Sequence, residues 1–123
     1  MKRILIDTNA LMAIGEWKID LFLALEEECD FLYTIAVLQG TINELQFIQQ
    51  EQRGKYQAAA KLALALLKAK KVTIIPSGTD VDGALVEYSH QGYLVLTQDI
   101  PLKKRLAKPY LTIRQKKKVI TIK

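Results

Sequence analysis

The sequence has almost none of the residues that build disulfide-linked or zinc-binding proteins. Cys29 is the one cysteine and His90 the one histidine in the chain, so an internal disulfide and a zinc site rich in cysteine and histidine are excluded. No apolar run approaches the roughly 20 residues of a membrane-spanning helix, and the N-terminus lacks the charged-then-apolar pattern of a signal peptide. We therefore expect a cytoplasmic protein without a membrane segment.

Acidic residues are absent after Asp99, although nine basic residues follow it. The preceding chain carries nine basic and thirteen acidic residues, so the net charge of +5 is concentrated in the C-terminal quarter. This asymmetry is typical of a protein that binds a phosphate backbone. Judged by charge alone, a basic surface that is merely solvated is an equally good explanation. The candidate phosphate contacts form two short runs, Lys103, Lys104 and Arg105, then Lys116, Lys117 and Lys118.

The 123 residues are half hydrophobic, which suffices for one core, and we predict a single domain over residues 1–123. Predicted strands and helices alternate. This pattern favours an α/β fold, a three-layer α/β/α sandwich with a mostly parallel central sheet. The strands are predicted at 3–7, 31–36, 72–75, 93–97, 110–113 and 119–122. The helices are predicted at 10–14 and 19–28 with a break near Gly15, at 41–50, at 58–69, from 80 or 82 to about 90, and after Asp99.

The predicted helix at residues 58–69 is rich in alanine and leucine almost all round. A helix without a polar face is either buried in the core or placed at a contact between subunits. We therefore expect a homodimer.

The polar residues after the first predicted strand are the strongest indication of a site. Residues 4–6 suit a buried strand, and Asp7, Thr8 and Asn9 follow it directly. Because the carboxyl ends of parallel strands and the N-termini of the following helices meet at one edge of a sheet, acids at other strand-to-helix junctions should gather there. These acids are Glu44, Asp80 or Asp82, and Asp99.

Each of these acids also has a purely structural explanation. Thr8, Asn9 and the aspartates suit helix N-caps, and Thr41 with Glu44 fits the capping-box pattern. Taken together, however, three or four carboxylates at one edge stay ionised only when a cation lies between them. Mg²⁺ or Mn²⁺ suits an all-oxygen site, and Thr8, Asn9 and Thr97 could orient water or phosphate oxygens by hydrogen bonds.

Five short motifs follow one another along nearly the whole chain. They are IDTNAL at residues 6–11, NEL at 43–45, DGALV at 82–86, TQD at 97–99 and LKKRL at 102–106. In this order and spacing, the chain resembles the PIN-domain family of metal-dependent ribonucleases. Within that family it is most similar to the compact archaeal branch, akin to nucleases that process ribosomal RNA, and to the toxin nucleases of toxin-antitoxin pairs.

The resemblance implies endonucleolytic hydrolysis of single-stranded RNA, in RNA processing or in toxin-type cleavage. Asp7, Glu44, Asp82 and Asp99 would be both the catalytic residues and the ligands of Mg²⁺ or Mn²⁺, and the basic runs would hold the RNA. The resemblance also raises the expectation of a homodimer and of an antitoxin-like protein partner.

Two positions depart from the family pattern. Gly83 stands where relatives often carry the second of two adjacent acids, which leaves Asp82, or Asp80 in its place, as the third carboxylate. Gln98 stands where many relatives have asparagine. The first departure motivates a second hypothesis, a PIN-like domain that binds RNA or a protein partner without cleaving. A phospho-acceptor receiver domain is a third hypothesis, but receivers usually place adjacent acids after the first strand, and here Asp7 is alone.

Overall fold

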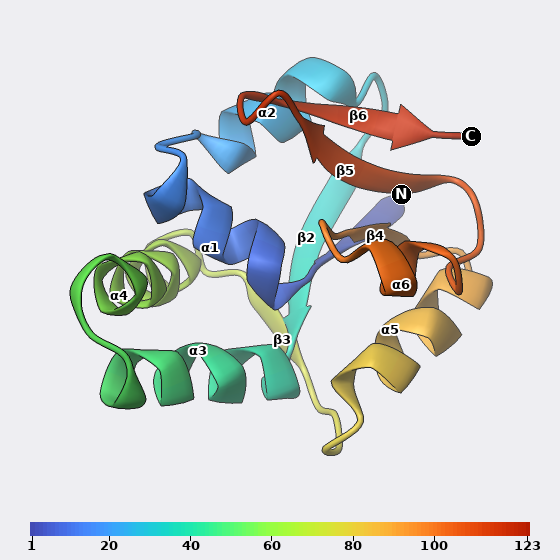
Figure 1. The fold of residues 1–123 in the computed structure, drawn as a ribbon. Coiled ribbons are helices and arrows are strands. Elements are labelled where there is room, and N and C mark those ends of the chain that lie inside the picture. The colour runs from blue at the N-terminus through green and yellow to red at the C-terminus, as the bar shows by residue number, and fades with distance from the viewer.

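The computed structural model describes residues 1–123 and contains six helices and six strands (Figure 1). The strands are β1 (Lys2–Ile6), β2 (Tyr33–Leu38), β3 (Thr73–Ile75), β4 (Leu94–Leu96), β5 (Tyr110–Arg114) and β6 (Lys118–Ile122). The helices are α1 (Thr8–Glu16), α2 (Leu21–Glu28), α3 (Gln39–Glu51), α4 (Gly54–Ala69), α5 (Val81–His90) and α6 (Ile100–Lys103). Strand and helix alternate along most of the chain, as the sequence predicts.

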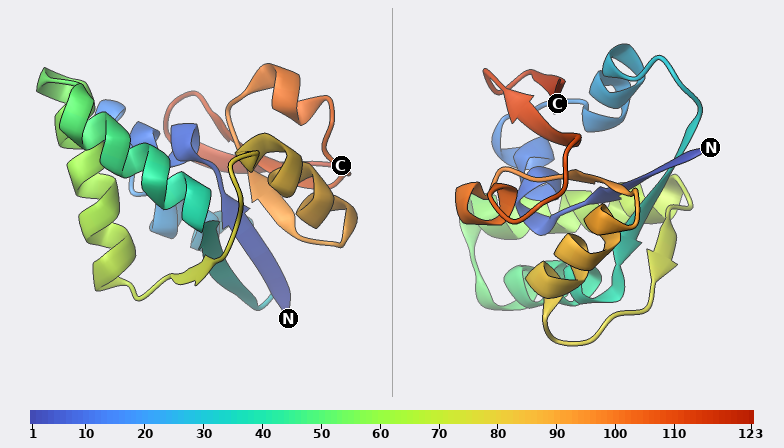
Figure 2. Two further views of the ribbon diagram at one scale, coloured as in Figure 1. Left: turned by 90° about the horizontal axis from the view of Figure 1, so that it is seen from below. Right: turned by 90° about the vertical axis from the view of Figure 1, so that its right-hand side faces the viewer.

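All six strands form one sheet, in the order β3-β2-β1-β4-β5-β6. The first five strands are parallel, and β6 pairs with β5 in the antiparallel direction. Helices α1 to α4 cover one face, and α5 and α6 cover the other (Figure 2). The predicted three-layer α/β/α sandwich with a mostly parallel sheet is therefore confirmed.

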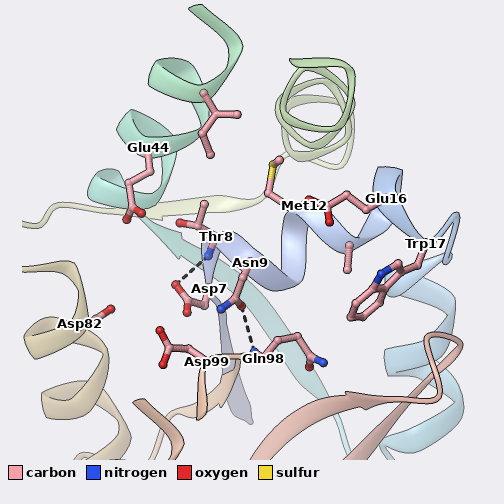
Figure 3. Close-up of a pocket in the computed structure, with 12 residues that line it drawn as sticks. Asp7, Thr8, Asn9, Met12, Glu16, Trp17, Glu44, Asp82, Gln98 and Asp99 are labelled. Atoms are coloured by element: carbon pink, nitrogen blue, oxygen red, sulfur yellow. Dashed lines mark hydrogen bonds between the residues drawn. The ribbon is translucent and has the colours of Figure 1, made fainter. Parts of the chain in front are cut away.

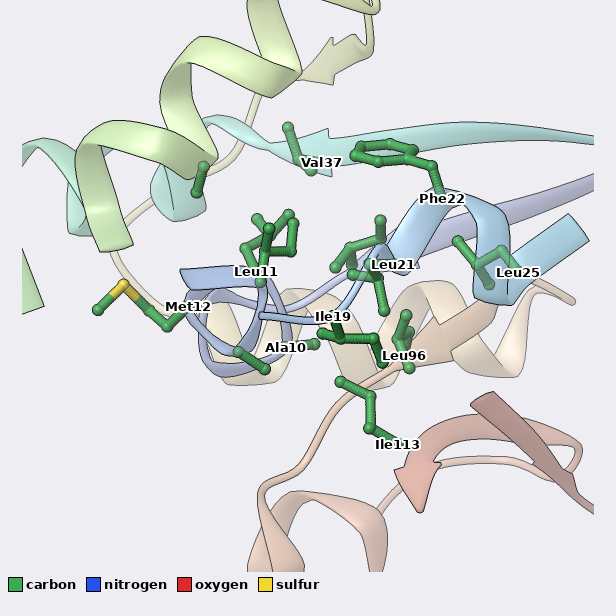
Figure 4. Close-up of a cluster of buried hydrophobic side chains, with 14 of the residues drawn as sticks. Ala10, Leu11, Met12, Ile19, Leu21, Phe22, Leu25, Val37, Leu96 and Ile113 are labelled. Atoms are coloured by element: carbon green, nitrogen blue, oxygen red, sulfur yellow. The ribbon is translucent and has the colours of Figure 1, made fainter. Parts of the chain in front are cut away.

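The central strands are apolar throughout because both of their faces are buried. Ile4 and Ile6 of β1 point into the larger core under α1 to α4, whereas Leu5 between them points into the smaller core under α5 and α6. Figure 4 shows the larger core, in which Leu11 of α1 packs among residues of the sheet and of the neighbouring helices. All three β1 side chains are inaccessible to solvent, so β1 is the fixed centre of the fold.

The order of the strands creates a crevice at the carboxyl ends of β1 and β4. These strands are neighbours, but α1 leaves β1 toward one face and α6 leaves β4 toward the other. Ligands of open α/β sheets bind at such switch points. Receiver domains have a different strand order, 2-1-3-4-5, so the third hypothesis from the sequence is wrong.

The predicted helix break near Gly15 is present but lies at residues 17–20, because α1 continues through Gly15 to Glu16. After Glu16 the chain changes direction at Lys18, which adopts a positive φ of 53°. Asp20 is the N-cap of α2, and its side chain accepts a hydrogen bond from the Leu23 N–H. Glycine is needed at position 15 for another reason. A Cβ atom there would lie 2.8 Å from both Cα and Cβ of Ala59 in α4.

Helix α4 packs against α1 and α3, and this contact explains much of its apolar surface. Ala59, Ala60, Ala63 and Leu67 are buried, whereas Leu62 remains 42% exposed. Of the two explanations that the sequence offered for this apolar helix, burial in the core is therefore confirmed. The contact between subunits, and with it the homodimer, stays a prediction. None of the six helices combines the length and the apolar character that crossing a membrane requires.

We predict that Gly15→Ala lowers the free energy of unfolding by about 1–3 kcal/mol, because the added methyl group pushes α4 away from α1. Gly78→Ala is the control, since no atom lies within 4 Å of a Cβ at that position. Urea denaturation measures both variants. Equal stability of the Gly15→Ala variant and the wild type would show that the two helices tolerate the extra volume.

Candidate active site

A cavity of about 360 Å³ opens at the carboxyl ends of β1 and β4 (Figure 3). Five carboxylates line it, from α1, α3, α5 and the residues that precede α1 and α6, and no lysine, arginine or histidine does. They are Asp7, Glu16, Glu44, Asp82 and Asp99. The cavity is therefore strongly negative, and it lies at the switch point that the strand order creates.

Asp7 is the most constrained of these acids. Its side chain is only 6% exposed and accepts hydrogen bonds from the Thr8 N–H (2.8 Å) and the Thr97 hydroxyl (2.7 Å). Burial raises the pKa of Asp7 above its ordinary value, the two hydrogen bonds oppose that rise, and the nearby Asp82 and Asp99 add to it. The carboxylate is thus fixed in position while its charge is left without a cationic partner.

Thr97 connects Asp7 to the turn that carries Asp99. Its hydroxyl oxygen also accepts a hydrogen bond from the Asp99 N–H at 3.1 Å, and the side chain is inaccessible to solvent. Asn9 holds the same turn from the other side, because its carbonyl oxygen accepts from the Gln98 N–H at 3.0 Å (Figure 3). Thr8 and Asn9 line the cavity, whereas Thr97 lies behind it.

Gln98 fastens this turn to β5. Its carboxamide donates to the Ile113 carbonyl (3.1 Å) and accepts from the Ile113 N–H (2.6 Å), so it pairs with that residue as a neighbouring strand would. The Thr112 hydroxyl donates to the same carbonyl oxygen at 2.7 Å. The sequence marks Gln98 only as a departure from asparagine, whereas the structure gives the longer side chain this contact with β5.

Glu44 lies inside α3 and does not cap the helix. Helix α3 begins at Gln39, the Gly40 N–H donates instead to the Ser77 hydroxyl at 2.9 Å, and the buried Thr41 hydroxyl has no partner. The capping-box explanation is therefore wrong. Partial burial raises the pKa of Glu44, the charge of Asp7 raises it further, the nearby Thr8 hydroxyl opposes the rise, and Asp82 adds to it.

The structure separates the two aspartates at the start of α5. Asp80 is the N-cap and accepts a hydrogen bond from the Gly83 N–H at 2.9 Å, whereas Asp82 lines the cavity. Gly83 does not line it, and a Cβ at that position would collide with the Asp80 carboxylate. A side chain at position 83 would therefore require the Asp80 carboxylate to shift.

The predicted basic contacts lie outside the cavity. Lys103 in α6 is half-buried, and burial lowers its pKa while Asp99 opposes that change. Lys116 extends from the β5–β6 turn to Trp17, with its Nζ 5.7 Å from the centre of the indole ring. The other predicted contacts, Lys104, Arg105, Lys117 and Lys118, are exposed.

Several cavity residues on or directly after α1 were not among the site residues predicted from the sequence. Glu16 and Trp17 line the cavity together with Asn9 and Met12. Their spacing from Asn9, three residues to Met12 and seven to Glu16, is that of one helix face. Continuing the helical periodicity through Gly15 would have placed Glu16 on the same wall as Asn9.

The donor atoms of the cavity suit a hard divalent cation. Carboxylate oxygens are the protein ligands that Mg²⁺ and Mn²⁺ prefer, and the buried Thr8 hydroxyl has no hydrogen-bond partner of its own. No three acidic, histidine or cysteine side chains lie in a geometry that would hold an ion directly. Mg²⁺ usually keeps several waters and needs only one or two protein carboxylates, so three direct protein ligands are not required.

The chain belongs to the PIN-like domain family, whose model matches residues 4–117. It is similar to ribonuclease VapC4 of Methanocaldococcus jannaschii, with 29% identity over 124 residues that cover 95% of this chain and 94% of that protein. Its fold is similar to the PIN domain endonuclease Utp24, with a TM-score of 0.77 and 26% identity over 97% of this chain and 90% of that one. The predicted family is confirmed, and both relatives support a nuclease function.

We predict that Asp7→Asn stabilises the protein against unfolding in the presence of a chelator at neutral pH. Because the folded-state pKa of Asp7 is raised, ionisation of this carboxyl disfavours the folded state above that pKa. The asparagine variant has no such charge and retains groups for the hydrogen bonds to Thr8 and Thr97. Thermal unfolding across a pH series measures the difference in Tm between variant and wild type.

The difference should be fully present above the raised folded-state pKa and should shrink as the pH falls toward about 4, the ordinary value for aspartate. Asp30→Asn, at an exposed position outside the cavity, serves as the matched control. A variant less stable than the wild type at neutral pH would contradict the claim that the Asp7 charge opposes folding.

Proposed function

We propose that this chain is a divalent-metal-dependent endoribonuclease that hydrolyses phosphodiester bonds of single-stranded RNA. The observation that carries the proposal is the cavity with five carboxylates and no basic residue at the switch point of a PIN-like fold. The names of the two relatives, a ribonuclease and an endonuclease, support the same reaction class. The natural role is either RNA processing or toxin-type cleavage.

We assign Asp7, Glu44, Asp82 and Asp99 to one or two Mg²⁺ or Mn²⁺ ions. When bound, such an ion lowers the pKa of water and stabilises negative charge on the phosphate. Asp7 suits the central position, because two hydrogen bonds fix its carboxylate. Glu44 and Asp82 face it from α3 and α5, and both side chains are open to solvent, so they can turn toward a cation without moving the sheet.

The polar side chains near Asp7 divide into two groups by accessibility. Thr8 and Asn9 line the cavity, and we assign them to orienting a water molecule or a phosphate oxygen. The Thr8 hydroxyl is buried and unpartnered, so Asn9 is the more accessible of the two. Thr97 was predicted to do the same. Its hydroxyl already bridges Asp7 and the Asp99 N–H, and we therefore assign Thr97 to positioning these two carboxylates.

The basic residues would hold the RNA backbone on either side of the cavity. Lys103, Lys104 and Arg105 follow Asp99 directly, and Lys116 to Lys118 lie at and beside the β5–β6 turn. Phosphate contacts of this kind position a strand without reading its sequence. The homodimer, an antitoxin-like partner and a cytoplasmic location accompany this proposal as predictions from the sequence.

The non-catalytic hypothesis rested on Gly83. Gly83 does not line the cavity, whereas Asp82 does. The absence of a second adjacent acid therefore removes no carboxylate from the proposed metal site, and we favour the active nuclease.

Asp82→Asn and Asp80→Asn form a matched test, since the same substitution is made two residues apart on one helix. We expect Asp82→Asn to lower cleavage of a labelled single-stranded RNA by more than about a hundredfold, because a proposed metal ligand is lost. Asp80→Asn should cleave at the wild-type rate, since asparagine caps helices about as well as aspartate. Cleavage is measured with Mn²⁺ in excess, and circular dichroism checks that both variants fold.

Equal activity of the Asp82→Asn variant and the wild type would contradict the assignment. Loss of activity in the Asp80→Asn variant alone would move the third carboxylate to position 80. Absence of metal-dependent cleavage in all three proteins would favour the non-catalytic hypothesis.

A further inference from the structure

Trp17 occupies an unusual place for the only tryptophan of the chain. It caps the C-terminus of α1 and packs partly against the larger core, yet it also forms part of the cavity wall that carries the carboxylates. Figure 3 shows the indole on the opposite side of the site from Glu44 and Asp82, beyond Asn9 and Gln98. Core packing accounts for the buried part of the ring but not for its position beside the acids.

Lys116 reaches the same ring from the other end of the chain. Its ammonium group lies 5.7 Å from the ring centre, within the range of a cation–π interaction. The turn that presents it is closed by the Lys117 N–H donating to the Arg114 carbonyl. Gln115 and Lys116 both have φ of 57° there, a conformation that usually favours glycine or asparagine. The turn with these unfavourable φ angles is therefore the one that places the Lys116 ammonium group beside the Trp17 ring.

A strand of RNA needs such a cation close to this site. Five carboxylates line the cavity and no basic residue does, so a phosphate next to the reacting one meets repulsion except where a positive side chain is within reach. Single-stranded nucleic acids are bound by cations that follow the backbone and by aromatic rings on which bases stack. Trp17 and Lys116 provide one group of each kind at one end of the cavity.

The cavity continues past the acids at its other end. A second cavity of about 760 Å³ shares Glu44, Ile48 and Asp82 with the first and extends to Phe47, whose side chain is 61% exposed. A strand that enters at Trp17 thus has a path past the carboxylates and out along α3. The Trp17 end is the one that combines an aromatic ring with a cation.

We propose that Trp17 and Lys116 form a nucleotide subsite for single-stranded RNA, in which a base stacks on the exposed part of the indole in place of the Lys116 ammonium group, and Lys116 then binds the adjoining phosphate. The subsite rests on the proposed function, since it places the strand beside the proposed metal ligands. It makes its own claim about binding, however, and that claim is independent of cleavage.

The first experiment uses Trp17 as the reporter, because no other tryptophan contributes to its fluorescence. Wild-type protein in EDTA, where metal-dependent cleavage is stopped, is titrated with a single-stranded RNA of about eight nucleotides. An abasic strand of the same length, which has the same phosphates and no bases, is titrated in parallel. We expect saturable quenching with the RNA and little change with the abasic strand. Equal quenching by both strands, or none by either, would overturn base stacking on Trp17.

The second experiment measures affinity by anisotropy of a labelled RNA under the same conditions. Trp17→Leu should weaken binding by about 5- to 150-fold, the range for loss of one stacked base, and Trp17→Phe should weaken it less. Thermal unfolding identifies any variant that fails to fold. A folded Trp17→Leu variant with wild-type affinity would overturn the subsite.

Lys116→Gln should reduce the slope of log affinity against log salt by about one, as expected for one lost phosphate contact. Lys70→Gln is the matched control, because Lys70 lies over the Phe22 ring in a cavity at the other edge of the sheet. Equal slopes for the Lys116→Gln and Lys70→Gln variants would overturn the role of Lys116. No metal is present in these binding experiments. The expected losses of affinity and of salt dependence would therefore support the subsite even if the protein cleaves no RNA. Normal cleavage by the wild type without these losses would refute the subsite but not the proposed nuclease function.

Discussion

Burial of the Asp7 carboxylate beside other carboxylates at one edge of the sheet is the constraint on which the site depends. Asp7 is buried in this group without a cation from the protein, and its raised pKa shows that burial and the neighbouring acids disfavour its charge. The fold holds the carboxylate in place through two hydrogen bonds, and the stability of the core offsets the cost. A divalent cation would relieve the repulsion. If the proposed metal site is correct, the same arrangement that disfavours the charge of Asp7 in the metal-free protein favours binding of a cation.

The topology explains why the acids meet. Asp7 ends the most buried strand, Asp99 follows the neighbouring strand, and the crossovers through α3 and α5 bring Glu44 and Asp82 to the same edge. The acids therefore come from four separate parts of the chain. Hydrogen bonds hold the Asp7 and Asp99 carboxylates, whereas Glu44 and Asp82 are exposed. Thr97 and Gln98 connect the first two, since together they fasten the β4–α6 turn to Asp7 and to β5. Family membership places these residues in a nuclease fold, and their contacts explain how this chain positions them.

The sequence predicted the fold class and nearly all of the elements, because these depend on apolar runs. It also predicted that acids at strand ends would gather, and Asp7, Glu44, Asp82 and Asp99 do line one cavity, whereas their role as metal ligands stays a proposal. It failed where the outcome depends on a contact between distant residues. Gly15 suggests that the helix breaks at this residue, until Ala59 of α4 is known to lie against it. Glu44 fits a capping box until the Ser77 hydroxyl is seen to bind the start of α3. The pairing of Lys116 with Trp17 could not be predicted, since it requires the conformation of the β5–β6 turn.

Calorimetric titration of metal-free protein with Mn²⁺, carried out on wild type and on Asp7→Asn near neutral pH, tests the central claim most directly. The account predicts saturable binding to the wild type and loss of that binding in the variant, which folds and keeps its other carboxylates. Equal binding by the two proteins would show that Asp7 does not hold the ion. Absence of binding to the wild type would contradict the claim that this acidic cavity is a metal site.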